Sequence, residues 1–377
     1  MNNKPSYERY NRQIQLKEFG ETGQRKLSQA KVVVIGAGGL GCPALQYLTA
    51  AGVGAIGIVD DDIIALTNLH RQPLYATEDI GYHKAEIAAD RLRRLNPEIS
   101  IVVYNERLTV ANALKIIGAF DIVIDGSDNF ATRYLVNDAC VLSNKPFVYG
   151  AVSQFEGQVS VFNFKSSEGV VSVNYRDIFP IPPKENEVMN CAEGGVLGIL
   201  PGIIGTMQAN EVIKLITGIG KPLINSLLTY NALDNQSMEI ALIANAAGQA
   251  LIPASIEAFE SMNYELLCGA ETSPLEIDAN EFDQYINEGT AMIIDVREIG
   301  ELPGVTEFSH EHVPLAQLKQ RSLKPDHDTV ILFCQSGQRS LEAAKYLLSV
   351  SGNSRKVFSL KGGIRLWKQQ HQKKAAL

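Results

Sequence analysis

The chain has 377 residues, 45% of them hydrophobic and 20% charged, which is typical of a soluble globular protein long enough for two domains. Acidic residues outnumber basic residues by 42 to 34, and the net charge of -8 argues against nucleic acid or an anionic membrane as the main partner. No uninterrupted apolar stretch reaches membrane-spanning length, the N-terminus does not resemble a secretory signal, and the five cysteines are widely spaced, so we expect a cytoplasmic protein without a disulfide framework.

From residue 31 to 150, apolar runs typical of strands alternate with stretches of helical periodicity. The expected strands are 31–35, 55–60, 99–104, 121–125 and 146–149, and the expected helices are 39–50, 83–95, 111–117 and 132–143. This alternation predicts an α/β fold with a doubly wound, mainly parallel, Rossmann-like sheet. Ligands of such sheets bind at the carboxyl ends of the strands.

The pattern changes after residue 150, which indicates how the chain is divided. We predict a first domain over residues 1–245, a linker over 246–273, and a second, smaller α/β domain over 274–377. The linker is expected there because the periodicity is weak and small residues are frequent. Outside the first α/β stretch, further strands are expected at 157–164, 226–231, 291–295, 329–333 and 356–359, with helices at 202–217 and 339–349.

A glycine-rich segment joins the first predicted strand to the first predicted helix. Its glycines are Gly36, Gly38, Gly39 and Gly41, and Asp60 ends the next strand. Glycine lets the backbone approach phosphates closely, and the free N–H groups at a helix start bind anions. By itself this loop fits a NAD or flavin domain equally well, because a strand-end acid binds ribose in either case.

Polar residues after Asp60 favour a nucleoside triphosphate over a dinucleotide. These residues are Asn68, Arg71, Gln72, Lys84, Asp128 and Asn129. A triphosphate carries about four negative charges, so it needs cations near its β and γ groups and an acid to hold magnesium. We interpret Arg71 and Lys84 as the cations and Asp128 as the Mg²⁺ ligand. The alternative is two ordinary surface charges and a helix cap before Thr132.

Together with the segment Arg9–Gln13, these motifs match a known family. The chain resembles the ubiquitin-activating-enzyme superfamily, in particular molybdopterin synthase adenylyltransferase (MoeB) and its thiamine-pathway relative (ThiF), over roughly residues 5 to 245. The resemblance implies ATP-dependent adenylation of the C-terminal glycine of a ubiquitin-like sulfur carrier. It also implies that Gly39 and Asp60 bind the nucleotide, and that Arg12 reaches the triphosphate from the partner subunit of a homodimer.

The same resemblance bears on Cys191 and on a zinc site. Cys191 lies before the predicted helix 202–217, in a segment similar to the family's crossover loop, which implies a second-step thiol; the alternative is a small buried hydrophobe. The family usually holds structural zinc with two C-x-x-C pairs. At these positions the chain has Asn174 and Asp177, and then Ala244 and Ala247, so we expect no zinc site.

A second candidate site begins at Cys334, between a predicted strand and a predicted helix. The loop continues with Gln335, Ser336, Gly337, Gln338 and Arg339. A helix N-terminus, backbone N–H groups and an arginine stabilise an anionic thiolate or persulfide. Cysteine phosphatases use a similar loop with one more residue between Cys and Arg, so the shorter spacing here favours sulfur chemistry.

The loop, together with Asp295–Glu298, Val313–Leu315 and Gly362–Trp367, resembles rhodanese sulfurtransferases over about residues 275 to 370. Gln335 stands where many rhodaneses have arginine, which lowers the positive charge at the loop. The segment 302–312 is also unlike the usual connection. Both departures leave the sulfur donor open, with a cysteine desulfurase as one candidate.

The two resemblances predict an adenylyltransferase fused to a sulfurtransferase, with ATP and Mg²⁺ as cofactors. The carrier, ending in Gly-Gly, is expected to become an acyl adenylate that a persulfide on Cys334 attacks before Cys191 releases the thiocarboxylate. Two alternatives stay open, namely adenylation of a peptide or small carboxylate in a biosynthetic pathway and a non-catalytic binding protein. The sequence does not distinguish molybdopterin, thiamine, tRNA thiolation or another pathway.

Overall fold

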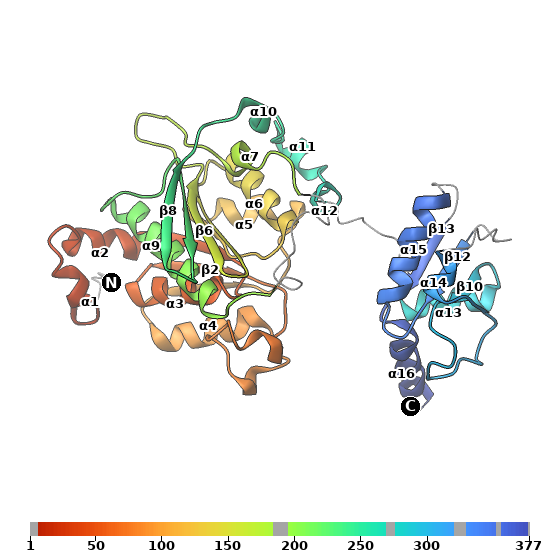
Figure 1. Cartoon of the computed structure of the whole chain (residues 1–377). Coiled ribbons are helices and arrows are strands. Elements are labelled where there is room, and N and C mark those ends of the chain that lie inside the picture. The colour runs from red at the N-terminus through yellow and green to blue at the C-terminus, as the bar shows by residue number, and fades with distance from the viewer. Residues whose placement is uncertain (1–6, 184–194, 269–275, 320–328, 352–355, 376–377) are drawn as a thin grey trace. The chain divides into compact units, whose positions relative to one another are not determined.

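The computed structural model describes residues 7–183, 195–268, 276–319, 329–351 and 356–375. The chain divides into two compact units, Met1–Gly269 and Ala270–Leu377 (Figure 1). Each unit has its own sheet and its own hydrophobic core.

The first unit is built around an eight-stranded sheet in the order β3-β2-β1-β4-β5-β6-β7-β8. Neighbouring strands from β3 to β5 are parallel, and those from β5 to β8 are antiparallel. The strands are β1 (Lys31–Ile35), β2 (Ala55–Val59), β3 (Ser100–Tyr104), β4 (Ile122–Asp125), β5 (Phe147–Ser153), β6 (Glu156–Phe162), β7 (Ser226–Asn231) and β8 (Gln236–Ala241). Because β1 lies between β2 and β4, the chain order reverses there, and a crevice is expected at this point.

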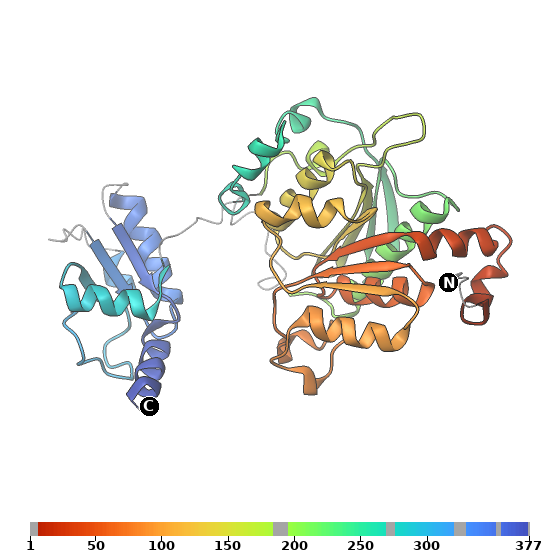
Figure 2. The ribbon, with the colours of Figure 1, turned by 180° about the vertical axis from the view of Figure 1, so that it is seen from behind.

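Helices cover both faces of this sheet, which confirms the predicted doubly wound α/β fold. Successive residues of β1 alternate between the two cores: Val32 and Val34 pack with α3, α4 and α9, whereas Val33 packs with α5 and α6. The longer helices are α1 (Tyr7–Ile14), α2 (Gly20–Gln29), α3 (Gly41–Ala51), α4 (Lys84–Leu95), α5 (Val110–Gly118), α6 (Phe130–Leu142) and α9 (Ile199–Thr217). Figures 1 and 2 show α1 at the margin of the unit. Among the described residues, no helix combines the length and the apolar character needed to cross a membrane.

The second unit has a five-stranded, wholly parallel sheet in the order β11-β10-β12-β13-β9. Its elements are β9 (Glu276–Ile277), α13 (Ala279–Glu288), β10 (Met292–Asp295), β11 (Glu311–His312), α14 (Leu315–Leu318), β12 (Thr329–Phe333), α15 (Gln338–Ser351), β13 (Lys356–Leu360) and α16 (Gly363–Ala375). Central strand β12 again serves two cores: Leu332 packs with residues of α15, and Phe333 packs with Phe282 and Trp367. The predicted smaller α/β fold is therefore confirmed.

The segment 246–273, for which the sequence predicts a linker, is partly helical. Its described part contains α10 (Ala246–Gln249), α11 (Ile256–Glu260) and α12 (Tyr264–Leu267). Phe259 and Tyr264 are buried in the same core as α5 and α6. The described residues up to 268 therefore pack as part of the first unit, because two aromatic side chains anchor them there.

A hydrogen bond joins the segment of Asn174 and Asp177 to residues 244–247. Asn174 caps α7 (Tyr175–Ile178). Oδ2 of Asp177 accepts from the backbone N and from Nδ2 of Asn174, both at 2.7 Å. Oδ1 of Asp177 accepts from the backbone N of Asn245 at 2.7 Å. With alanine at 244 and 247 and this carboxylate already occupied by N–H donors, the residues present do not fit a four-thiolate zinc ion.

Close packing of α10 against α7 yields a stability prediction at Gly248. A Cβ at Gly248 would lie 2.1 Å from the carbonyl oxygen of Arg176, so Gly248→Ala must push the two helices apart. We expect the free energy of unfolding of the first unit to fall by about 1–3 kcal/mol, measured by urea unfolding. Gly118→Ala is the control, because a Cβ there meets nothing within 4 Å. Equal unfolding midpoints for the two variants would contradict the direct α7–α10 junction.

Candidate active sites

A cavity of about 980 Å³ opens at the carboxyl ends of β1, β2 and β4. The sequence-predicted residues in its wall are Gly36, Gly38, Gly39, Asp60, Asn68, Arg71, Gln72, Lys84, Asp128 and Asn129. Gly41 is not part of the wall; it begins α3, where a Cβ would lie 1.9 Å from the carbonyl oxygen of Gly36. The structure therefore brings together the predicted nucleotide-binding residues, with Gly41 shaping the loop behind them.

Asp60 and Tyr75 hold the glycine loop in place. Oδ2 of Asp60 accepts from the backbone N of Ala37 at 2.7 Å, and Oδ1 accepts from the backbone N of Asp62 at 2.9 Å. The Tyr75 hydroxyl donates to the carbonyl oxygen of Ala37 at 2.8 Å. Burial raises the pKa of Asp60, while the nearby Lys84 and these N–H donors oppose that shift. Asp60 thus fixes the loop and also faces the cavity.

Two cations line the same cavity, and only one of them is paired with a carboxylate. Lys84 is only 5% exposed, and its ammonium donates to Oδ2 of Asp62 at 2.7 Å. Arg71 donates to the carbonyl oxygen of Thr67 at 2.8 Å and contacts Nε2 of His70 at 3.0 Å. Within the described part of the chain, no carboxylate pairs with Arg71, so its charge is available to an anion.

Asp128 lies in the turn between β4 and α6 and is exposed to the cavity. The cap of α6 is Asn129, whose Oδ1 accepts from the backbone N of Thr132 at 2.8 Å. The alternative interpretation of Asp128 as the helix cap is therefore wrong. Among the described residues, none donates a hydrogen bond to the Asp128 carboxylate, which leaves it free for a cation.

A buried ion pair between Asp125 and Arg133 supports this turn. The sequence did not predict this pair. Oδ1 of Asp125 accepts from the backbone N and the hydroxyl of Ser127 at 3.0 and 2.6 Å, and Oδ2 lies 3.4 Å from Nε of Arg133. The guanidinium of Arg133 lies 5.5 and 5.2 Å from the ring centroids of Phe130 and Tyr149. Burial raises the pKa of Asp125, and Arg133 opposes that shift. Asp125 and Arg133 are only eight residues apart, but the sequence does not show that Arg133 turns back from α6 onto the end of β4.

Cys334 directly follows β12 and begins the short loop that leads to α15. Its Sγ accepts from the backbone N of Gly337 at 3.2 Å and from the Ser340 hydroxyl at 3.5 Å. Ser340 is held in turn by the Ser359 hydroxyl at 2.8 Å. Gly337 has a φ of 95°, a conformation that favours glycine, and this turn points its N–H at the sulfur. The loop therefore surrounds a buried sulfur with neutral donors.

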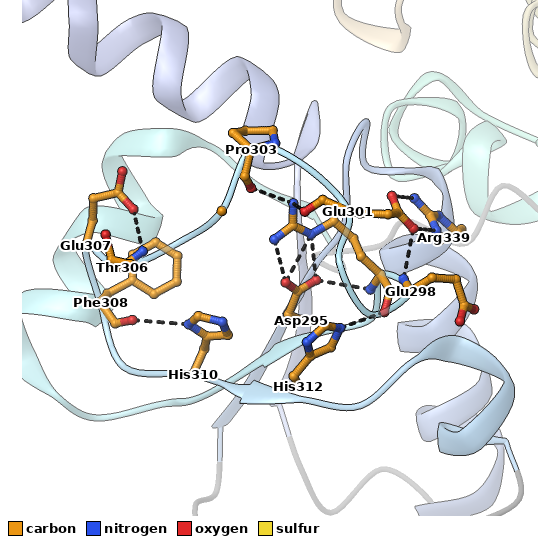
Figure 3. A network of polar contacts seen from close by, with 12 residues as sticks. Asp295, Glu298, Glu301, Pro303, Thr306, Glu307, Phe308, His310, His312 and Arg339 are labelled. Atoms are coloured by element: carbon orange, nitrogen blue, oxygen red, sulfur yellow. Dashed lines mark hydrogen bonds and ion pairs between the residues drawn. The ribbon is translucent and has the colours of Figure 1, made fainter.

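The remaining residues of the predicted persulfide loop point in different directions. Ser336 and Gln338 are exposed, and Gln335 is partly buried, with its side-chain Oε1 unpaired among the described residues. Arg339 forms a two-pronged ion pair with Glu301 (Figure 3). The only charged side chain of the loop is thus already paired.

Arg12 is exposed on α1 and is not part of the cavity wall of its own chain. Cys191 lies outside the described residues. Cys42 and Cys140 are fully buried, and burial raises the pKa of Cys42 to about 12.

The ion pair beneath Asp128 gives a stability prediction. Asp125→Asn leaves the Arg133 charge buried without its partner, so the free energy of unfolding of the first unit should fall by about 3 kcal/mol in urea unfolding. The double variant Asp125→Asn/Arg133→Met removes both charges and should recover most of this loss. Asp90→Asn, which breaks an exposed ion pair with Arg94, is the control and should change stability little. An unchanged Asp125→Asn protein would show that the pair does not support the turn.

Comparisons with known proteins agree with this two-site arrangement. Residues 10–251 match the ThiF family and residues 278–370 match the rhodanese-like domain. The probable adenylyltransferase/sulfurtransferase MoeZ of Mycobacterium tuberculosis is 40% identical over 97% of this chain and 93% of its own length. The sulfur carrier protein adenylyltransferase of Thermus thermophilus is 47% identical over 71% of this chain and 98% of its own. The crystal structure of E. coli MccB with MccA-N7isoASN has a similar fold, with a TM-score of 0.56 and 22% identity over 65% of this chain and 76% of that one.

The matches confirm the predicted family of each domain and the fusion of the two. Nearly the full length of the chain aligns with a relative that is named for both transferase activities. The chain therefore belongs to the ThiF family, in the adenylyltransferase/sulfurtransferase form that carries a rhodanese-like domain.

Proposed function

We propose that this adenylyltransferase/sulfurtransferase activates the C-terminal glycine of a ubiquitin-like sulfur carrier ending in Gly-Gly, and then supplies it with persulfide sulfur. One observation carries the first half: Arg71, Lys84 and Asp128 line one cavity with the glycine loop. The name of the Thermus thermophilus relative, sulfur carrier protein adenylyltransferase, supports a carrier as substrate. A cysteine desulfurase is a fitting sulfur donor, and the cytoplasm a fitting location.

ATP fits this cavity as the activating nucleotide. The glycine loop offers backbone N–H groups to phosphate, Arg71 and Lys84 offset its charge, and Asp60 is placed for the ribose. Asp128 would hold Mg²⁺, which neutralises charge on the triphosphate. Magnesium at nucleotide sites is commonly bound by one or two carboxylates and by phosphate oxygens, so the exposed Asp128 carboxylate fits this use.

In the adenylation step the first unit positions the carrier carboxylate and ATP, and it forms no covalent bond to either. The carrier carboxylate attacks the α-phosphorus, and pyrophosphate leaves, while the cations and the loop hold the reactants in line. A persulfide on Cys334 attacks the activated carbonyl, and AMP leaves. The segment that carries Cys191 resembles the family's crossover loop, so we assign the next step to Cys191. Its thiolate attacks the acyl disulfane, which releases the thiocarboxylate and leaves a disulfide between Cys191 and Cys334.

Carrier-dependent ATP–pyrophosphate exchange tests this function. The full chain should catalyse exchange with a carrier ending in Gly-Gly and not with the same carrier lacking its last glycine. Asp128→Ala should lower the exchange rate on the order of a hundredfold, because a metal-binding carboxylate is lost. Asp90→Ala removes an exposed acid outside the cavity and should leave the rate unchanged.

Cys334→Ser separates the two halves of the proposal. This variant should keep full exchange and lose thiocarboxylate formation, measured by the mass of the carrier. Normal thiocarboxylate formation by Cys334→Ser with a sulfide-free donor would eliminate the second half. Exchange that survives Asp128→Ala would remove the metal assignment, and exchange that requires a small carboxylate instead of a carrier would favour the alternative substrate class.

Arg12 yields a prediction about subunits. We propose that the protein is a homodimer in which Arg12 of one protomer reaches the triphosphate of the other; its exposure on α1, outside its own cavity wall, supports this arrangement. Arg12→Ala and Asp128→Ala should each be inactive, and mixed dimers should regain about a quarter to a half of the exchange rate, since one complete site forms per heterodimer. Arg25→Ala, an exposed arginine on α2, serves as the control. No recovery in demonstrated mixed dimers would contradict action across the interface.

A further inference from the structure

We propose that Glu301 sets the sulfur-donor preference of the second unit by clamping Arg339, so that the Cys334 loop favours an organic persulfide, whose leaving thiolate carries one charge, over dianionic thiosulfate. The inference rests on the proposed sulfur-transfer function and adds the chemical class of the donor. It assigns Glu301 a specificity role outside the loop that carries the reacting sulfur.

Glu301 forms a bidentate ion pair, called the clamp here, with Arg339, the only cation in the loop. Nη1 and Nη2 of Arg339 donate to Oε1 and Oε2 of Glu301 at 2.5 and 2.7 Å (Figure 3). No other residue from Cys334 to Gln338 is basic. The loop therefore presents neutral donors to a bound group, not an unpaired positive charge.

The turn that carries Glu301 is built to hold this carboxylate. Oε1 of Glu301 also accepts from the backbone N of Glu298 at 2.8 Å. Arg297, which is 3% exposed, fastens the turn by donating to Oδ2 of Asp295 at 2.6 Å and to the carbonyl oxygen of Pro303 at 2.8 Å. Glu301 is thus preorganised on a buried support, unlike a surface acid with a free side chain.

The charge state and the neighbours of the pair agree with this role. The hydrogen bonds from Arg339 lower the pKa of Glu301 to about 2, so the pair stays ionised at every working pH. Glu298, in the same turn, adds a further exposed acid. Arg365 approaches the loop through its backbone N, which donates to the carbonyl oxygen of Gln335 at 3.3 Å, and its side chain is exposed.

The two donor classes place different charges beside Cys334. With thiosulfate, the Cys334 thiolate attacks the outer sulfur, the sulfur–sulfur bond breaks, and sulfite leaves with the bonding electron pair and two negative charges. With an organic persulfide, the same attack transfers the outer sulfur with its proton, and a thiolate with one negative charge leaves. A dianion entering this site needs an unpaired cation, whereas Gly337 N–H and the Ser340 hydroxyl can serve a single charge.

Thiosulfate:cyanide sulfurtransferase kinetics of the full chain test the proposal. Glu301→Gln frees Arg339 and should lower KM for thiosulfate by about fivefold to tenfold, with kcat changed by less than about twofold. Glu298→Gln removes an equal charge from the same turn without breaking the clamp, so its KM should stay within about twofold of the parent value. The double variant Glu301→Gln/Arg339→Gln should lose the gain, because Glu301 acts through Arg339.

Two further measurements separate specificity from a merely structural role. Loading of Cys334 from 2-mercaptoethanol persulfide, followed by the mass gain of one sulfur atom, should proceed at the parent rate in Glu301→Gln. Gln335→Arg adds a cation to the loop while leaving Glu301 intact, and it too should lower KM for thiosulfate. An unchanged KM in both Glu301→Gln and Gln335→Arg would overturn the proposal, as would equal changes for both donors.

The outcomes also distinguish this proposal from the function on which it rests. If the parent protein loads Cys334 from neither donor, sulfur transfer by this unit fails and the specificity role fails with it. If the parent loads Cys334 well but Glu301→Gln leaves the donor preference unchanged, only the role of Glu301 fails. Carrier-dependent exchange should be equal in parent and Glu301→Gln, because adenylation does not involve the clamp.

Discussion

The turn that carries Asp128 rests on the buried pair of Asp125 and Arg133, and the rest of the first site is arranged around it. Asp125 ends β4 next to β1, so its carboxylate lies beneath the same edge at which the glycine loop begins. Removing its charge from water is unfavourable, and the compensation comes from Ser127 and Arg133. The pair therefore couples the sheet to the exposed Asp128, whose carboxylate no described residue engages. A carboxylate held on a buried support in this way fits the Mg²⁺ role that we propose for Asp128.

The two sites use charge in opposite ways. In the first unit, Arg71 has no carboxylate partner among the described residues, whereas Lys84 donates to Asp62, so Arg71 offers an unpaired cation in the same cavity wall as the glycine loop. In the second unit, Glu301 neutralises Arg339. A triphosphate has several charges to offset, whereas a persulfide has one. The availability of an unpaired cation at each site thus matches the charge of the anion proposed for that site.

Much of the fold and of the nucleotide cavity could be predicted because the relevant residues follow strand ends in order along the chain. Asp60 and Asp128 are of this kind. The ion pairs Asp125–Arg133 and Glu301–Arg339 could not be predicted, because their partners meet only in the folded chain. Glu301, for example, lies 38 residues before Arg339. Strand β8 escaped prediction because every one of its residues is exposed and no apolar alternation marks it. The helices between 246 and 268 escaped because isolated aromatic residues such as Phe259 anchor them.

Burial alone does not decide what a cysteine can do in this protein. Cys42 and Cys334 are both fully buried at the junction between a strand and the following helix. The Sγ of Cys42 donates to the carbonyl oxygen of Ala37 at 3.3 Å, an arrangement that requires the protonated thiol. The Sγ of Cys334 instead accepts hydrogen bonds from the backbone N of Gly337 and from the Ser340 hydroxyl. The direction of the hydrogen bonds at sulfur, set for Cys334 by the turn at Gly337, is what distinguishes these two buried cysteines.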